Sequence, residues 1–237
     1  MTTSAEDLNA AIAALQSAAD AYNGKKAEID NKVNTLVNSA SALLSRSIHI
    51  DPVNGDDANS GDANNPVKTL AGAAALTATS GQYDIVIYGD LVCDKRIVFK
   101  GQSIMFRTDA LYTKRRIDFA NQIDGVDTRC PHIVMGQKMG VLDFRDIIFG
   151  NNAAAPHVVY KRMIEGTGFT VVNTWICEWD TAAGDDLHFV GSNSQVALWI
   201  LSGTFPAEQA GHWMEGVAAA TDPATVSKLV NTNLTTL

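Results

Sequence analysis

Six oxygen-bearing side chains lie close together in the segment 51–62 and could bind a cation. They are Asp51, Asn54, Asp56, Asp57, Asn59 and Asp62. Carboxylate and amide oxygens at short spacing are the ligands that Ca²⁺ requires, although no Glu closes the loop as in an EF-hand. The same residue types form Asx-turns, in which the side chain accepts a hydrogen bond from a nearby backbone amide. We favour Asx-turns, and therefore no metal or other cofactor, and keep calcium as the alternative.

A second cluster of titratable side chains lies near residue 180. It contains Glu178, Asp180, Asp185 and Asp186, with His188 close by. Two carboxylates at a suitable separation can hydrolyse a glycosidic bond. The segment 181–186 is also typical of an exposed turn, and the chain has no GxSxG, HExxH or phosphate-binding glycine loop. We therefore predict no enzymatic activity and no catalytic residue, with glycan cleavage as the alternative.

The composition limits the partners that the chain can have. The 237 residues are 46% hydrophobic and 19% charged, which is a globular composition. A net charge of −8 argues against nucleic acid as the main partner. The longest apolar runs, such as Val196–Leu201, are far shorter than the roughly 18 residues that span a bilayer, so we expect no membrane insertion. Glu6 and Asp7 precede any Lys and no apolar segment follows them, so we expect no secretory signal peptide.

Cysteines and charges are unevenly placed along the chain. Cys93, Cys130 and Cys177 are too few and too widely spaced for a disulfide scaffold, and we expect reduced thiols. The odd number leaves an intermolecular disulfide open. Seven basic residues lie in the segment 95–116, and seven acidic residues without any Lys or Arg lie in the segment 178–222. Such blocks form solvated faces, or they meet each other or a partner across an interface.

The first 45 residues carry an apolar heptad repeat. Its positions are Leu8, Ile12, Leu15, Ala19, Tyr22, Lys26, Ile29, Val33, Leu36, Ala40 and Leu43. Steps of four and three residues alternate without a slip, which predicts the core-facing positions of a left-handed coiled coil. Ser4 and Asp7 suit the N-terminal cap of this helix. A single helix of this kind would expose its apolar stripe, so we predict an oligomerisation seam formed by these residues other than Lys26.

The segment 23–26 interrupts the seam. It contains Gly24, which costs a helix about 1 kcal/mol relative to Ala, and places Lys26 at a core position. Two helices joined by a kink or a turn, and an αα-hairpin packed on its own domain, are therefore alternatives. We favour an oligomeric coiled coil because the heptad register continues across the interruption.

The segment that follows the heptads predicts a strand, a loop and a short helix. Ile48 and Ile50 alternate with polar residues, and Asp, Asn, Gly and Pro then dominate. Asn65 suits a helix N-cap and Pro66 the first helical position. The apolar face of this helix is Leu70, Ala73, Ala74 and Leu76, and the helix is expected to stop near 80–81.

Residues 48–61, Ile-His-Ile-Asp-Pro-Val-Asn-Gly-Asp-Asp-Ala-Asn-Ser-Gly, followed by Pro-Val-Lys-Thr-Leu at 66–70, resemble the opening segment of right-handed parallel β-helix proteins. The segment is especially similar to that of bacteriophage tail fibres and tailspikes. The resemblance covers about 35 residues, and polysaccharide lyases and surface proteins share this opening. It implies a short helix that caps one end of a β-helix, and the preceding heptads favour a phage fibre.

Short strand candidates fill the middle of the chain. They span 83–90, 96–99, 103–107, 117–119, 132–135, 141–144, 147–149, 169–172, 175–178, 187–190 and 195–201. About 120 residues of this kind suit five or six turns of a small β-helix, a sandwich or a barrel. Trp175, Trp179 and Trp199 could lie in the core, at a subunit interface or on a carbohydrate-stacking platform. Near the C-terminus, Asp222 and Pro223 predict a short helix over 221–230, within a tail that docks or frays.

The prediction is a mainly β chain with an α N-terminus: a trimeric coiled coil followed by a short right-handed parallel β-helix. Its expected parts are a stalk (1–47), a junction loop with a capping helix (48–82), a β-helix-like domain (83–205) and a tail (206–237). The expected function is that of a phage fibre or spike protein of the tail, baseplate or neck, made in the host cytoplasm and located in the virion. Expected partners are two further copies, other virion proteins at the N-terminal segment and a host surface glycan. The alternatives are a short polysaccharide depolymerase and a cell-surface adhesin module.

Overall fold

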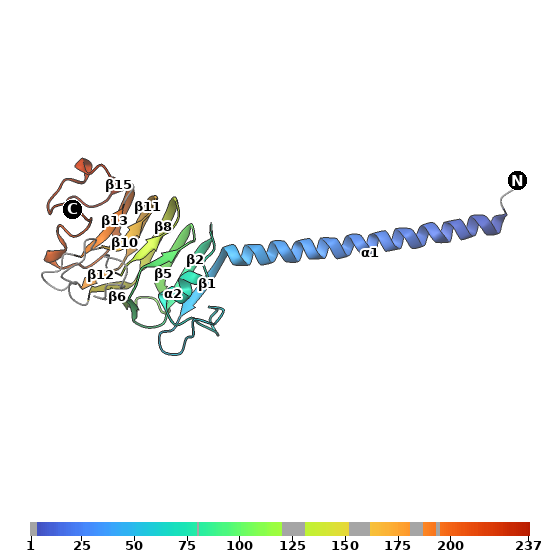
Figure 1. Cartoon of the computed structure of the whole chain (residues 1–237), viewed down its shortest axis with the longest axis horizontal. Helices are drawn as coiled ribbons and strands as arrows, with labels where there is room; N and C mark the ends of the chain where they lie inside the picture. Colours follow the sequence, from blue (N-terminus) through green and yellow to red (C-terminus); the bar gives the residue numbers. More distant parts are fainter. Residues whose placement is uncertain (1–3, 80, 120–130, 152–161, 181–186, 193–194) are drawn as a thin grey trace. The chain divides into compact units, whose positions relative to one another are not determined.

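The computed structural model describes residues 4–79, 81–119, 131–151, 162–180, 187–192 and 195–237. The chain divides into two units, Met1–Leu43 and Leu44–Leu237. One helix makes up the described part of the first unit, and three parallel β-sheets dominate the second (Figure 1). The prediction of a mainly β chain with an α N-terminus is confirmed.

Helix α1 runs without a break from Ala5 to Leu44. The Ser4 hydroxyl accepts a hydrogen bond from the Asp7 amide at 3.2 Å, and the Asp7 carboxylate accepts one from the Ser4 amide at 3.3 Å, so the predicted N-cap is confirmed. The helix continues through Gly24, where no atom other than the adjoining backbone of the helix itself lies within 4 Å of the place where a side chain would begin. The alternatives of two helices and of an αα-hairpin within residues 5–44 are therefore wrong.

Three sheets form the second unit, and all strands pair in parallel. Sheet A has seven strands in the order β1 (Ser45–Ile50), β2 (Gln82–Ile87), β5 (Ser103–Thr108), β8 (Met139–Arg145), β11 (Phe169–Trp175), β14 (Val196–Leu201) and β15 (Leu229–Thr232). Sheet C has the order β12 (Glu178–Asp180), β9 (Ile147–Asn151), β6 (Arg115–Phe119) and β3 (Leu91–Cys93). Sheet D has the order β13 (His188–Ser192), β10 (Arg162–Gly166), β7 (Ile133–Met135) and β4 (Ile97–Phe99).

The chain visits the three sheets in a fixed rotation. From β2 to β14, a strand of sheet A is followed by one of sheet C and then one of sheet D, and the next strand of sheet A lies beside the previous one. β15 follows β14 directly and is also in sheet A. Side chains alternate between inside and outside along each strand, so in-register stacking aligns the inward residues. One such column is Ile48, Ile85, Phe106, Phe144, Thr174 and Ile200, all of them buried.

Aromatic rings continue this core between the sheets. Phe106 stacks on Phe144 with ring centroids 4.8 Å apart, and Phe144 meets Phe149 edge to face at 5.1 Å. Trp179 then packs against Phe149 at 5.4 Å and against Trp213 at 5.2 Å. Offset and edge-to-face rings at these distances add to the burial of apolar surface.

The short helix α2 (Leu70–Ala75) begins later than Asn65 and Pro66 indicate. Its N-cap is Thr69, whose hydroxyl accepts a hydrogen bond from the Gly72 amide at 3.0 Å. Leu70, Ala73 and Ala74 are buried in the core of the β unit. The prediction of a helix that begins at Asn65 is therefore wrong, whereas a short helix that packs on the first strands is present.

The C-terminal segment also differs from its prediction. Asp222 caps a three-residue 3₁₀ helix, η2 (Pro223–Thr225), by accepting a bond from the Ala224 amide. The chain then enters β15 instead of continuing a helix to residue 230, and a second 3₁₀ helix, η1, spans Ala207–Gln209. Leu237 is buried, with 2% of its surface exposed, so the end of the chain packs onto the β unit.

Most predicted strands overlap an observed strand, with three differences in the middle of the chain. The segment 175–178 is not a strand, because β11 ends at Trp175 and Ile176 turns the chain with a positive φ of 54°. Strands β3 and β10 are additional to the prediction. β10 contains Arg162 and Glu165, which are both 3% exposed and break the apolar pattern.

Candidate self-association surface and junction loop

The predicted seam is an exposed stripe along α1. Leu15 and Tyr22 are 71% and 70% exposed, and Leu36 is 69% exposed. Leu8, Ile12, Ala19, Ile29 and Val33 are exposed as well, and Val37 lies beside them. The side chains of Ala40 and Leu43 lie outside the described residues. An amphipathic helix normally buries such a stripe, so this face is a candidate surface for association with other chains.

The acidic residues of the junction loop bond to the backbone of the loop itself. Asp51 accepts hydrogen bonds from the amides of Val53 and Asn54, at 2.9 and 3.0 Å. Asp62 accepts bonds from the amides of Asn64 and Asn65, at 2.8 and 3.0 Å. Asp56 bonds the Ala58 amide in the same way, and the Asn59 side chain donates to the Pro66 carbonyl. The prediction of Asx-turns is confirmed by these bonds.

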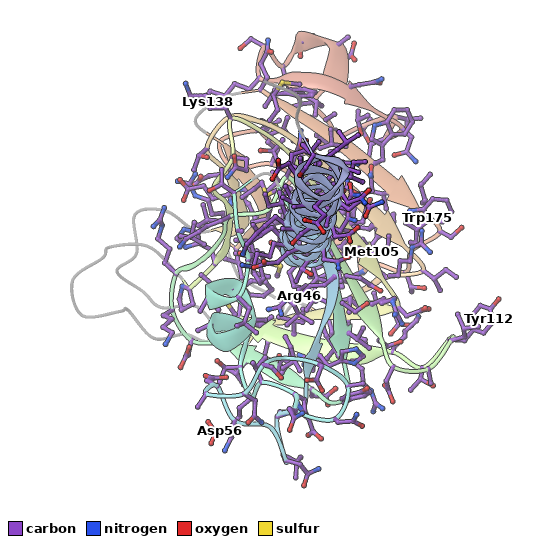
Figure 2. All side chains as sticks on the ribbon, turned by 90° about the vertical axis from the view of Figure 1, so that its right-hand side faces the viewer. Arg46, Asp56, Met105, Tyr112, Lys138 and Trp175 are labelled. Carbon is purple, nitrogen blue, oxygen red and sulfur yellow. The ribbon has the colours of Figure 1, made fainter. Side chains whose placement is uncertain are left out.

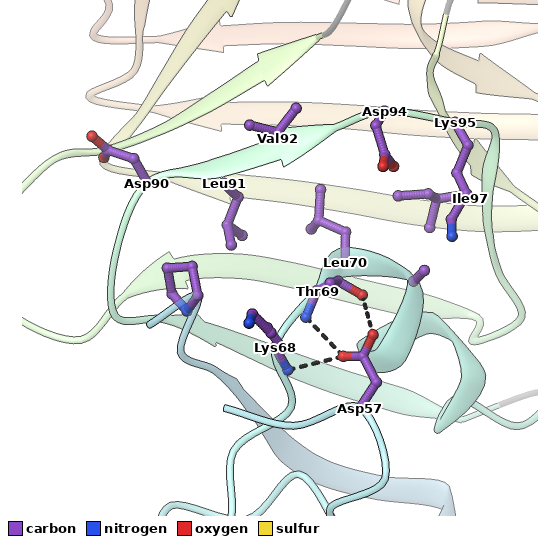
Figure 3. Close-up of a pocket in the computed structure, with 12 residues that line it drawn as sticks. Asp57, Lys68, Thr69, Leu70, Asp90, Leu91, Val92, Asp94, Lys95 and Ile97 are labelled. Carbon is purple, nitrogen blue, oxygen red and sulfur yellow. Dashed lines mark hydrogen bonds between the residues drawn. The ribbon is translucent and has the colours of Figure 1, made fainter. Parts of the chain in front are cut away.

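Asp57 joins the junction loop to α2 (Figure 3). Its carboxylate accepts bonds from the amides of Lys68 and Thr69, at 2.9 and 2.8 Å, and from the Thr69 hydroxyl at 2.6 Å. Thr69 in turn caps α2, so Asp57 holds the capping residue in place. Gly72 leaves room for this carboxylate, since a Cβ at that position would collide with it.

The pocket beside Asp57 has a volume of about 300 Å³ and lies between the loop, α2 and β3 (Figure 3). Its walls include the apolar side chains of Leu70, Leu91 and Ile97, and its rim includes Asp90 and Lys95. Asp90 accepts a bond from the Arg116 amide at 2.8 Å. Asp57 and Asp90 thus both accept hydrogen bonds from backbone amides. The pocket lies where the junction loop packs beside the first strands.

These hydrogen bonds lower the pKa values of the loop carboxyls. Bonds from Asn54 hold the pKa of Asp51 below its usual range, and bonds from Ser60, Asn64 and Asn65 lower the pKa of Asp62 to about 2. Burial raises the pKa of Asp57, but bonds from Thr69 and Lys68 outweigh burial and leave the pKa lowered. A carboxyl whose pKa is lower in the folded state stabilises that state above its unfolded pKa of about 4. The contribution of Asp62 is lost as pH falls from about 4 through about 2.

We expect the junction loop to be insensitive to chelator and sensitive to the loss of Asp57. Asp57→Ala removes three hydrogen bonds and should lower the free energy of unfolding by about 1–2 kcal/mol. Asp51→Ala should cost about 1 kcal/mol for the same reason. Thermal denaturation with and without EDTA, in both variants and the parent, measures these effects. A fall of several degrees on EDTA that calcium reverses would establish a metal-bound loop instead.

Ion pairs join the basic and acidic blocks of the sequence. Lys114, which directly precedes β6, pairs with Glu178 of β12. Arg116 of β6 pairs with Asp180 of β12 and, at 2.6 Å, with Asp118. The interpretation that the two blocks meet is confirmed by the first two pairs. Two of the four carboxylates considered for glycan cleavage are therefore tied to cations. Asp185 and Asp186 lie outside the described residues, and His188 begins β13 in sheet D rather than joining this ladder.

Gly150 allows the pair between Arg116 and Asp180 to form. It lies on β9, between β6 and β12, and a Cβ there would collide with the side chains of Arg116 and Asp118. The cations and acids that meet here are 64 residues apart in the chain. The charge blocks indicated that the two segments could meet, but the sequence did not show which residues pair. The parallel register of β6, β9 and β12 brings them together.

Gly150→Val should displace Arg116 and lower the free energy of unfolding by about 1–3 kcal/mol, because a side chain is forced into occupied space. Asp180→Asn is the matched control. It weakens the ion pair without adding volume and should cost about 0–1 kcal/mol, as expected of an exposed pair. Urea denaturation of the two variants compares these effects. Equal losses in both variants would show that Gly150 is not needed for close approach.

The three tryptophans considered together have different surroundings. Trp179 is buried in the aromatic core, Trp199 is half-buried, and Trp175 is 45% exposed with Arg145 5.6 Å from its ring centroid. Trp175 and Met105 lie on the outer face of sheet A (Figure 2). Polar residues of this face pair with each other: Arg107 with Asp84 at 2.7 Å, and Asn173 with Asp143 at 2.6 Å.

An exposed loop between β5 and β6 was not singled out by the sequence. Leu111 and Tyr112 are 85% and 77% exposed, and Tyr112 has a positive φ of 62° (Figure 2). Asp109 and Arg115 form an ion pair at 2.9 Å at its base. The adjacent apolar residues within a polar, basic segment are the signal that could have identified it.

Two cysteines are buried inside the β unit. Cys93 and Cys177 are free thiols with no exposed surface, and burial raises the pKa of both, to about 12 for Cys177. Buried, protonated thiols react slowly, which is consistent with the expectation of reduced cysteines at these two positions. Cys130 lies outside the described residues.

Among the helices in the described ranges, none is long and apolar enough to cross a membrane. Within the same ranges, no group of three or more His, Cys, Asp or Glu residues is arranged to hold a metal ion. Comparisons with protein-family models, with curated proteins and with solved structures found no match to the chain.

Proposed function

We propose that the chain is a structural protein of a bacteriophage particle, a homotrimeric fibre or spike component of the tail, baseplate or neck. In this proposal α1 forms a three-stranded coiled-coil stalk, and the three sheets form a short right-handed parallel β-helix. The stalk joins three chains and attaches them to other virion proteins. The β unit contacts the host surface, with a surface glycan as its expected ligand.

The exposed apolar stripe of α1 carries this proposal. The helix is 40 residues long, and each described member of the predicted seam is exposed. Helices in proteins owe most of their stability to the packing of an apolar face against other elements. A stripe with a constant heptad period over this length packs best against helices that have the same period. Further copies of the same chain have this period.

The β unit supports the fibre part of the proposal. Its strands follow a fixed rotation through three sheets with parallel pairing throughout, which is the strand order of a parallel β-helix. α2 packs against β1, β3 and β4, and in the proposal this helix caps one end of the β-helix. Buried columns such as Phe106 on Phe144 give this unit a rigid core.

The proposal assigns no enzymatic activity to the chain. Glu178 and Asp180 form ion pairs with Lys114 and Arg116, an arrangement that suits a structural ladder better than a pair of catalytic acids. Release of reducing sugars from host capsule or lipopolysaccharide, abolished by Asp185→Asn or Asp186→Asn, would establish the depolymerase alternative.

The virion location is tested on purified phage particles released from cells that carry the gene. Mass spectrometry of density-purified particles should detect the chain at a constant ratio to the major capsid protein. A non-structural phage protein from the same lysate serves as the control for contamination. Abundance in the lysate together with absence from the particles would contradict the proposal.

A further inference from the structure

The charged residues beside the seam favour one direction of alignment between copies of α1. With the seam written as heptad positions a and d, Leu8, Leu15, Tyr22, Ile29 and Leu36 occupy d, and Ile12, Ala19, Lys26 and Val33 occupy a. The flanking g positions include Lys25 and Lys32, and the flanking e positions include Asp30. The remaining described residues at e and g are uncharged, so these three residues supply the charges along the edges of the seam.

We propose that copies of α1 associate in parallel and in register, and that the pair between Lys25 of one copy and Asp30 of the next sets this direction. This inference rests on the proposed self-association. In a parallel coiled coil, a g residue of one helix faces the e residue five positions further along the neighbouring helix, and opposite charges there determine orientation. Lys25 and Asp30 have this separation.

The antiparallel arrangement brings like charges together. In that arrangement g positions face g positions, so Lys25 and Lys32 of one helix meet lysines of the other. Like-charge contacts disfavour an alignment. The charge pattern therefore both favours the parallel alignment and opposes the antiparallel one.

Asp30 is available for this contact. Within one chain, the ammonium groups of Lys25 and Lys32 donate to the Glu28 carboxylate, at 2.9 and 2.8 Å. No ion pair of Asp30 or Lys26 occurs among the described contacts of α1, and both residues are exposed. Asp30 is thus an exposed acid beside the seam, and Lys25 of a neighbouring parallel copy can form an ion pair with it.

The parallel direction has a consequence for function. α1 ends at Leu44 and β1 begins at Ser45, so no linker separates the helix from sheet A in the sequence. Parallel copies place these transitions at one end of the stalk, and antiparallel copies place them at opposite ends. A fibre that attaches by one end and contacts the host by the other requires the parallel case.

Disulfide cross-linking of the full chain tests the direction. Ile12→Cys and Leu36→Cys are made separately in a chain that also carries Cys130→Ser. The Cys130→Ser chain with no introduced cysteine is the control. In parallel, in-register copies each variant cross-links to itself on mild oxidation. A tagged Ile12→Cys chain and an untagged Leu36→Cys chain are also unfolded and refolded together. In parallel, in-register copies these two chains do not cross-link to each other, because positions 12 and 36 lie about 36 Å apart along the helix.

The outcomes separate this inference from the proposed function. Cross-links that form only between the two variants would overturn the parallel direction while keeping self-association. A native mass of one chain, with no cross-link in any sample, would overturn self-association itself and the inference with it.

Charge exchange tests the role of the pair. Asp30→Lys should weaken association about tenfold, as the loss of several exposed pairs predicts. Lys25→Asp combined with Asp30→Lys restores the opposite charges and should recover the parent affinity. Glu28→Gln, which removes only pairs within one chain, is the control and should leave association unchanged. A double variant as weak as Asp30→Lys alone would refute the pairing.

Discussion

Leu15→Asp and Leu36→Asp should each dissociate the assembly, and most of the helical signal of the stalk should be lost with it. Both residues occupy d positions and are about 70% exposed in a single chain. In the proposed coiled coil each would be buried, and an unpaired buried charge costs about 3–5 kcal/mol. Sedimentation and far-ultraviolet circular dichroism at micromolar concentration measure the two effects.

Ser17→Asp and Asn31→Asp are matched controls for these variants. They add the same charge close to Leu15 and Leu36, on the face of α1 opposite the seam. Both controls should keep the native mass. If the two leucine variants also keep the native mass and the helical signal, the seam is not an interface.

Phe144→Ala should be the most destabilising single change in the β unit among those considered. The side chain is fully buried, stacks on Phe106 and meets Phe149 edge to face. Truncation of a buried phenylalanine removes contacts and leaves a cavity, at a cost of about 3–5 kcal/mol. Urea denaturation monitored by tryptophan fluorescence measures the change.

Tyr112→Ala is the control for Phe144→Ala. Tyr112 is 77% exposed, so its truncation should change the free energy of unfolding by less than about 0.5 kcal/mol. A loss below 1 kcal/mol in Phe144→Ala would mean that the stacked aromatic column does not hold the sheets together.

Patterns that are local in the sequence predicted the structure well. The heptads identified α1 because the period of an amphipathic helix is contained in any short window. Alternation predicted β1, and short segments between turn residues predicted β5 and β14. The Asx-turns follow from residues two or three positions apart. The exposed stripe was therefore predictable from the sequence.

Features that depend on distant contacts were not predictable. The N-terminus of α2 is set by Asp57, which binds Lys68 and Thr69 from 11 and 12 residues away, whereas Asn65 and Pro66 carry the local signals. β10 was missed because buried Arg162 and Glu165 belong to a tertiary environment that the alternation rule does not describe. Partner positions of sheet A are 21 residues apart at Asp84 and Met105 but 30 apart at Asp143 and Asn173, so no fixed repeat length marks the turns of the chain.

The native mass of the full chain is the most direct test of the central claim, that α1 joins several copies. Sedimentation equilibrium at micromolar concentration should give three times the chain mass of 25.3 kDa. Because Leu at d with Ile or Val at a also suits two strands, a mass of two chains would keep self-association and correct its stoichiometry. A mass of one chain, stable over a hundredfold range of concentration, would contradict the claim.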